Sequence, residues 1–284
     1  MANESTTTTL NDLISPIVQE AMFVASETAI MPGLVKTFNV PANAGTTLQV
    51  PIYGTQDAAT VVEATGDLSN TAISTSKADI ILEEAGIMTT LTDMARNHSV
   101  SNVVADLGRV FGEAIAKKHD QALTGLFSSF STGINAATDT QSELTVEDLF
   151  KAYATLKAAN VPGPYYGVFN PKAIYNVKKS LTNTFNPNSN IDVINQAMTN
   201  GFVGRIAGID IFESSNVVET SATTSINAVF SRDALGLAVA QNINIETQRD
   251  ASLRASEIVA STRFGKAVLH NSYGVKLAVD NQIN

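Results

Sequence analysis

The feature that most constrains the fold is a long amphipathic pattern in the second quarter of the chain. Between residues 100 and 126, apolar side chains recur at three- and four-residue steps, which is helical spacing. About 27 residues of helix would span roughly 40 Å at 1.5 Å per residue. The opposite face carries Asp106, Arg109, Glu113, Lys117, Lys118 and Asp120. The pattern predicts one helix well above average length, with one face to bury and one charged face.

A long polar segment separates two strand-like segments that precede this helix. In residues 46–54 apolar side chains alternate, and Pro51 makes that strand an edge or exposed strand. The second strand is predicted over residues 80–88. The stretch between them, residues 55–79, is rich in Thr, Ser, Ala and Asp and is unusually long for a loop inside a compact domain. We expect an extended hairpin that reaches out from the body, with its tip near residues 65–67.

The rest of the chain reads as a mixture of helices and strands. At the N-terminus, residues 1–9 are polar, and helical spacing over residues 10–30 ends at Pro32 and Gly33. A Ser, Thr, Gly and Asn-rich break over residues 128–142 is the best domain boundary. After this break, a capping box at Thr145–Asp148 opens a helix. A strand over 165–169, a helix to Leu181, a loop over 182–190 and a short helix to Thr199 follow. Strands are predicted over 206–212, 226–230 and much of 243–279.

Charge is scarce and unevenly placed. Charged residues make up 16% of the 284 residues, against about 25% in typical soluble proteins, which suggests that partners cover much of the surface. Residues 1–95 hold two basic and eleven acidic side chains, whereas residues 96–284 hold sixteen of each sign. This asymmetry indicates an interaction function, although an acidic surface that aids solubility would explain it as well. The acidic balance argues against wrapping of nucleic acid.

The chain offers little catalytic chemistry. It has no cysteine, and its histidines His98, His119 and His270 lack metal-ligand spacing, so each is interpreted as an ordinary surface or hydrogen-bonded residue. An S-x-x-K match ending at Lys77 lacks the partner motifs of penicillin-binding enzymes. Glu83 and Glu84 are neighbours on a predicted strand and would point to opposite faces. We expect no enzyme activity, cofactor or metal, and neither a targeting segment nor a membrane span is apparent.

Five segments, in order along the chain, resemble the major capsid protein family of tailed bacteriophages. None of them is specific alone, and Val62 stands where the family often has a tryptophan. The segments are residues 60–66 (TVVEATG) followed by 69–81, residues 91–125 ending in AIAKKHDQALTG, the helix–strand–helix unit 147–181, residues 204–211 (GRIAGIDI), and the run from Arg263 through Gly274 to Val275. The resemblance spans about residues 10–279.

The resemblance implies an α+β, Hong Kong 97-like capsid fold. Its parts would be an N-terminal arm, an extended β-hairpin loop, a peripheral domain with a long spine helix, an axial α/β domain, and a return to the peripheral sheet. The expected limits of these parts are residues 1–45, 46–90, 91–144, 145–225 and 226–284, respectively.

The implied function is that of a structural shell protein of the virion. Copies of the chain would form hexamers and pentamers that close into an icosahedral shell around double-stranded DNA. A separate scaffolding protein, a portal and a decoration protein are the expected partners, with assembly in the host cytoplasm. At subunit interfaces we expect the acidic arm and loop to meet basic side chains of a neighbour's spine helix, with the candidate residues Asp57, Glu63, Asp67, Lys77, Asp79, Glu83, Glu84, Arg109, Lys117 and Lys118.

Other functions remain open at this stage. An encapsulin-like compartment would share the fold and enclose cargo enzymes instead of DNA. A hydrolase without a short motif, and a secreted surface-layer protein, are less favoured. A covalent cross-link through Lys77, the one lysine of the loop, has nothing beside it in sequence to support it.

Overall fold

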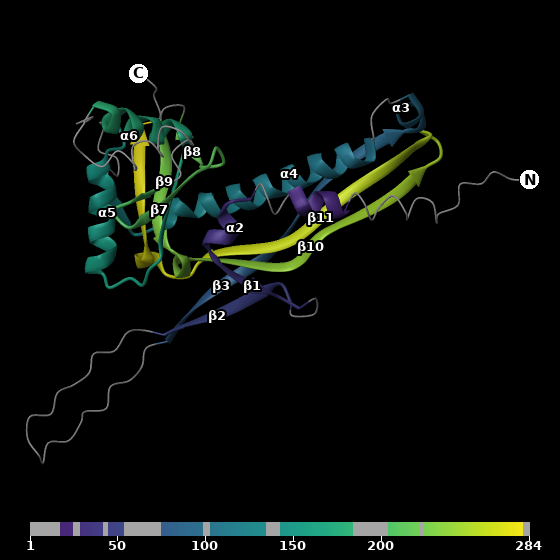
Figure 1. The fold of residues 1–284 in the computed structure, drawn as a ribbon. Helices are drawn as coiled ribbons and strands as arrows, with labels where there is room; N and C mark the ends of the chain where they lie inside the picture. The colour runs from purple at the N-terminus through teal and green to yellow at the C-terminus, as the bar shows by residue number, and fades with distance from the viewer. Residues whose placement is uncertain are drawn as a thin grey trace, which may run out of the picture.

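The computed structural model consists of two lobes that share one long helix (Figure 1). It describes residues 18–24, 29–41, 45–53, 75–98, 103–134, 143–183, 204–221 and 224–280. We call the part built on the five-stranded sheet the long lobe and the part built on the seven-stranded sheet the round lobe.

The five-stranded sheet forms the long lobe. Its spatial order is β1 (Lys36–Asn39), β10 (Leu235–Asp250), β11 (Ala255–Val268), β3 (Thr75–Thr92) and β2 (Thr47–Tyr53). β1 runs parallel to β10, and the other pairs are antiparallel. β2 is an edge strand, as Pro51 predicts, because a proline has no N–H for a second neighbour.

One helix covers one face of the long lobe. α4 (Val103–Thr124) follows the short α3 (Asp93–His98) and runs along β3 and β11 (Figure 1). Phe111 and Ile115 of α4 pack against Ile245, Ile258 and Ala260 of the sheet. Most of the predicted apolar face that the structure describes is therefore turned toward the sheet, although Val110 of that face is exposed, and 22 residues of the predicted pattern are α-helix.

The round lobe is a seven-stranded sheet with helices packed against it. Its order is β4 (Thr132–Ile134), β12 (Gly274–Asp280), β9 (Thr224–Ser231), β5 (Tyr165–Phe169), β7 (Ile209–Glu213) and β6 (Arg205–Ile206), with β8 (Glu219–Ser221) also paired to β9. α5 (Val146–Ala158) and α6 (Pro171–Asn183) contribute Leu149, Leu156 and Ile174 to its core.

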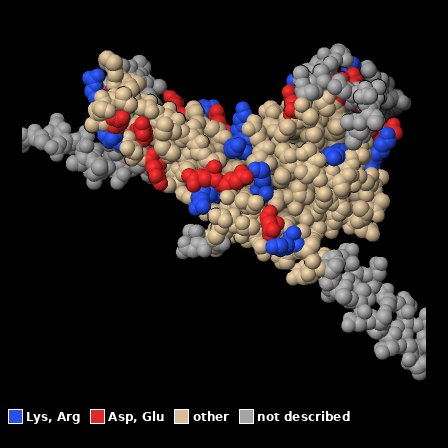
Figure 2. Space-filling model, turned by 180° about the vertical axis from the view of Figure 1, so that it is seen from behind, with Lys and Arg blue, Asp and Glu red and all other residues tan. Residues whose placement is uncertain are grey.

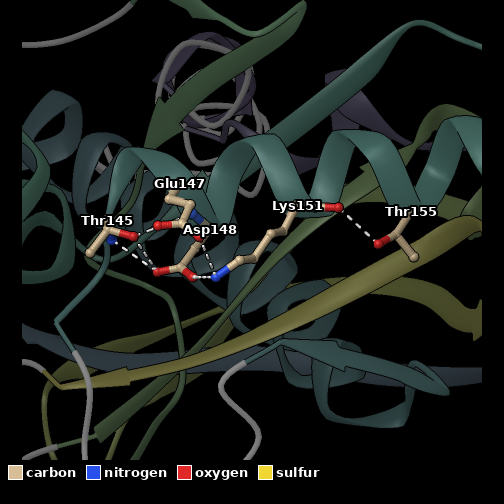
Figure 3. A network of polar contacts seen from close by, with 5 residues as sticks. All are labelled: Thr145, Glu147, Asp148, Lys151 and Thr155. Carbon is tan, nitrogen blue, oxygen red and sulfur yellow. Dashed lines mark hydrogen bonds and ion pairs between the residues drawn. The ribbon is translucent and has the colours of Figure 1, made fainter.

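The predicted capping box opens α5 (Figure 3). The backbone N–H of Asp148 donates to Thr145 Oγ1 at 3.3 Å, and the backbone N–H of Thr145 donates to Asp148 Oδ2 at 3.1 Å. Lys151 lies one turn further on, with its Nζ 3.0 Å from Glu147 Oε1. Two N–H groups that the first turn would leave unpaired are thus satisfied.

A shared apolar core joins the two lobes. After α4 the chain continues as the 3-10 helix η1 (Gly125–Ser129), which buries Phe127 beside Phe130 and Phe230. Phe230 belongs to the round-lobe sheet, whereas Leu235 of the same cluster begins a long-lobe strand. The lobes are therefore not separate hydrophobic units.

Several predicted elements differ in the structure. Residues 75–79 are strand and not loop, because they pair with β2. Residues 206–212 contain two strands, since Ala207 and Gly208 turn the chain with positive φ angles of 53° and 83°. Pro32 does not end a helix but occupies the first turn of a new one, α2 (Met31–Leu34), where a proline is tolerated.

Other predictions fall outside the described residues or across the observed sheets. The first part of the predicted helix 10–30 and residues 184–203 lie outside the described part. The expected limit between residues 225 and 226 falls inside β9. Residues 226–284 contribute β10 and β11 to the long lobe, and β12 to the round lobe.

Candidate assembly surface

The base of the predicted hairpin loop is formed by β2 and β3. Here Lys77 Nζ lies 3.7 Å from Asp79 Oδ1, so these two candidate residues pair within one strand. Asp57, Glu63 and Asp67 lie outside the described residues. Ala78 and Ile80 of β3 point inward between these charged side chains. The alternation fixes the charged side chains of β3 on its exposed face at this base.

Glu83 and Glu84 pair with the neighbouring strand β11. Lys266 Nζ lies 3.3 Å from Glu83 Oε2, and Arg263 Nε lies 4.0 Å from Glu84 Oε2. The two carboxylates point to opposite faces of the sheet, as their adjacent positions predict. Both are well exposed, so these pairs contribute little to stability. Figure 2 shows acidic and basic side chains side by side in a band across the molecule, with large uncharged areas around it.

The outer face of α4 carries the predicted basic side chains. Arg109 pairs with Glu113 one turn further on, at 3.2 Å. Lys117 and Lys118 are exposed, and in the part of the chain that the structure describes no ion pair reaches them. They are therefore the two cations of the candidate set with charge to offer a neighbouring molecule.

His119 corrects one interpretation. His119 is partly exposed, but its Nε2 is buried and has no hydrogen-bond partner within the described part, so the interpretation as an ordinary surface or hydrogen-bonded residue does not describe this nitrogen. Its ring lies 4.2 Å from the ring of Phe264, and burial lowers the pKa of His119 below its ordinary value. His119 follows the buried residues Ile115 and Ala116 by four and three positions, and this helical spacing is the signal in the sequence that could have indicated its burial.

Sequence reasoning missed one further group. Asp120 was assigned to the charged face of the helix, yet it is only 1% exposed. Backbone N–H groups from a distant segment donate to its carboxylate, and nothing in the local sequence signals such partners.

The described residues form no arrangement that suggests metal chemistry. Within them, no group of three or more His, Asp or Glu residues is placed to hold a metal ion. Across the same ranges, no helix is long and apolar enough to span a membrane. What the described surface offers is exposed sheet, a charged helix face and the paired strands β2 and β3 at the base of the predicted hairpin loop.

Comparison with known sequences identifies the family that has this arrangement. The sequence model of the phage capsid protein family matches residues 75–276, which include most of both lobes. The chain belongs to the phage capsid protein family. No match was found among curated proteins.

Solved structures agree with the capsid fold. The chain is similar to a protein of Mycobacterium phage Che8, with a TM-score of 0.66 and 19% identity over 88% of this chain and 90% of that one. A chain from the capsid of the cyanophage P-SCSP1u gives 0.67 and 18% over 89% of each. A virus-like particle from Pyrococcus furiosus gives 0.61 and 13% over 93% of this chain and 98% of that one.

These findings confirm the predicted family and fold class. The phage capsid protein is an α+β, Hong Kong 97-like chain, and its function is that of a major capsid protein, a structural subunit of the virion shell. The fold alone does not separate a phage capsid from other shells, since the virus-like particle shares it. The family match makes that distinction and favours the phage capsid over the encapsulin-like alternative.

Proposed function

We propose that copies of this capsid protein form hexamers and pentamers that close into an icosahedral shell around phage double-stranded DNA. The observation that carries this proposal is the family match, which extends across both lobes and not over a single motif. Rings require heterologous contacts, in which two different patches of the subunit meet. The acidic first third and the neutral remainder of the chain supply two such different surfaces.

The proposed contact joins the acidic hairpin of one subunit to α4 of the next. Residues 54–74 contain three acidic side chains, Asp57, Glu63 and Asp67, and no basic one. Lys117 and Lys118 are exposed and unpaired within the described part. Lys77, Asp79, Glu83, Glu84 and Arg109 have partners in their own chain, so we assign them a secondary part in this contact. Each pair contributes little, but the contact is repeated in every subunit.

The parts of the subunit carry the proposed roles of the family. We assign residues 1–45 to an N-terminal arm, 46–90 to the extended loop, 91–144 to the peripheral domain with the spine helix α4, 145–225 to the axial domain, and 226–284 to the return of the chain. A separate scaffolding protein, a portal and a decoration protein would complete assembly in the host cytoplasm. The enclosed DNA would be held without sequence-specific binding, consistent with a low charge density.

A charge-swap experiment tests the proposed contact. Lys117→Glu with Lys118→Glu should abolish or strongly reduce particles in electron microscopy and sedimentation, because the acidic hairpin would then meet like charge. Adding Asp57→Lys, Glu63→Lys and Asp67→Lys to that variant should restore particles. Arg232→Glu, at an exposed cation outside the proposed contact, is the matched control.

The outcomes separate the contact from the function. Normal particles from the double lysine variant would rule out this contact and leave the shell itself intact. A wild-type chain that stays monomeric even with a scaffolding protein would overturn the proposed assembly. Particles that contain protein cargo and no nucleic acid would show an encapsulin-like compartment in place of a DNA shell.

A further inference from the structure

Asp120 is a buried carboxylate at the meeting point of three chain segments. It lies near the C-terminal end of α4 and is 1% exposed. The described ion pairs include none with Asp120, so no lysine or arginine offsets its charge there. A buried carboxylate without a cation must be stabilised by hydrogen bonds or else become neutral.

The first partner segment leads into the long-lobe sheet. The backbone N–H of Met31 donates to Asp120 Oδ1 at 3.0 Å, and that of Ile30 donates to Oδ2 at 3.4 Å. Met31, Leu34 and Val35 then bury their side chains in the core shared by the lobes. β1 begins at the next residue and pairs with β10. Asp120 thus holds the segment that delivers β1 to the sheet edge.

The second partner segment belongs to the round lobe. Asn216, in the turn after β7, donates from Nδ2 to Asp120 Oδ2 at 3.4 Å. Thr124, one turn along α4, donates from Oγ1 to the carbonyl oxygen of Asn216 at 2.8 Å. The turn is itself fixed, because the N–H of Ser214 donates to the Phe169 carbonyl oxygen at 3.0 Å. Two side chains of α4 therefore bind the side-chain amide and the backbone carbonyl group of Asn216 in the round lobe.

The hydrogen bonds of Asp120 are not the simplest way to stabilise the core. Desolvation raises the pKa of Asp120, and hydrogen bonds from Met31, Ile30 and Asn216 counteract that rise. Replacing both partners of a buried side-chain hydrogen bond, such as that of Asp120 with Asn216, by apolar groups of the same shape can be nearly neutral or stabilising. Directional bonds, unlike apolar contacts, fix the relative orientation of the groups that they join.

We propose that Asp120 is a positioning residue that sets the angle between the long lobe and the round lobe of the capsid subunit. The proposal rests on the proposed shell function in one respect. The angle between the lobes matters for assembly because it would set the curvature of a shell built from neighbouring subunits. Asp120 acts through Asn216 on one side and through Met31 on the other. Thr124 supports the round-lobe contact.

The test uses the cysteine-free sequence of the chain. Thr90→Cys in the long lobe and Ala158→Cys in the round lobe are exposed positions for a pair of spin labels, and no native thiol competes. Pulsed electron spin resonance then measures the distribution of distances between the lobes in the isolated full-length chain. Asp120→Asn and Asn216→Ala are the variants, and Asp106→Asn, exposed on the same helix, is the control.

We expect a shifted or broader distance distribution in both variants and none in the control. Hydrogen exchange should rise about tenfold at Met31 in Asp120→Asn only, since a neutral amide then replaces the charged acceptor of its N–H. In Asn216→Ala, Met31 should keep its protection while the distance distribution still changes. A purely structural role would instead lower stability and leave the distances of the folded chain unchanged.

Particle geometry provides the second readout. Variants that still assemble should give particles with a wider range of diameters than the control in electron microscopy. Unchanged distances in Asp120→Asn and Asn216→Ala would overturn the proposal, whether or not particles form. Failure of the wild-type chain to form particles would count against the proposed function alone, since the distances are measured on the isolated chain.

Discussion

Arg249 and Asp93 face each other across the far end of the long lobe and form a two-pronged ion pair. Arg249 Nη1 donates to Asp93 Oδ1 at 2.8 Å, and Nη2 donates to Oδ2 at 2.6 Å. The backbone N–H of Asp93 also donates to the Arg254 carbonyl oxygen at 2.9 Å. The start of α3 is thereby tied to the end of β10 and to the turn that follows it.

Replacing Arg249 with lysine should loosen this end of the lobe. A lysine carries the charge but cannot present two parallel N–H groups to the carboxylate. In Arg249→Lys we expect faster hydrogen exchange in residues 93–95 and 251–254, with little change in the midpoint of global unfolding because the pair is exposed. Arg263→Lys, whose pair with Glu84 is longer, is the control. Equal exchange in Arg249→Lys and wild type would contradict the prediction.

The capping box of α5 gives a prediction about stability. Thr145→Ala removes the side-chain acceptor for the Asp148 N–H and should lower the free energy of unfolding by about 1 kcal/mol. Thr155→Ala removes a hydroxyl from the same helix, where Thr155 Oγ1 donates to the Lys151 carbonyl oxygen. That control should be neutral or slightly stabilising, since alanine favours helix. The measurement is chemical denaturation of the two variants side by side. An equal loss of unfolding free energy in both would show that the cap has no special role.

Close approach of β11 to β3 should make Gly265 intolerant of any side chain. A Cβ there would lie 2.5 Å from the Ile81 carbonyl oxygen and 2.8 Å from Ile80 Cγ2. Gly265→Ala must push the two strands apart, and we expect a loss of about 1–3 kcal/mol in unfolding free energy. Gly125→Ala is the matched control, because nothing lies within 4 Å of its added Cβ. Thermal unfolding that ranks the two variants equally would refute this steric account.

His119 predicts a dependence of stability on pH. Because burial lowers its pKa in the folded state, the unfolded chain binds the proton first as pH falls below about 6.5. The free energy of unfolding should therefore fall on acidification in this range. His119→Phe keeps a ring against Phe264 and cannot titrate, so it should flatten the slope below about pH 6.5. Parallel slopes in denaturation curves of the two proteins would show that another group titrates.

Much of the local structure could be predicted from sequence because its signals are local. The apolar spacing of α4, the capping box of α5 and the alternation in β2 each lie within one element, so the physical pattern and the structure coincide. The prediction of the fold rests on the order of five segments that resemble the capsid family, and not on periodicity. The strand at residues 75–79 was missed because its Ser, Thr and Lys side chains are exposed on an edge pairing.

Contacts between distant segments could not be predicted in this way. Asp120 looks like one more charged residue of a helix face until Met31, 89 residues away, is placed beside it. The same holds for the candidate assembly residues. Their charges are visible in the sequence, yet the partner of Glu83 is Lys266, 183 residues away, and depends on strand register.

The pairing of β1 with β10 has a consequence for folding during synthesis on the ribosome. Lys36 lies opposite Gly236, so the first strand of the sheet has no partner until about 200 further residues have been synthesised. At about 5–20 residues per second, that wait lasts roughly 10–40 s on the ribosome. During this time the apolar side chains of Met31, Leu34 and Val35 lack the core residues that come later in the sequence, such as Phe230 and Leu235. We therefore expect the incomplete chain to be prone to aggregation until its last third has been synthesised.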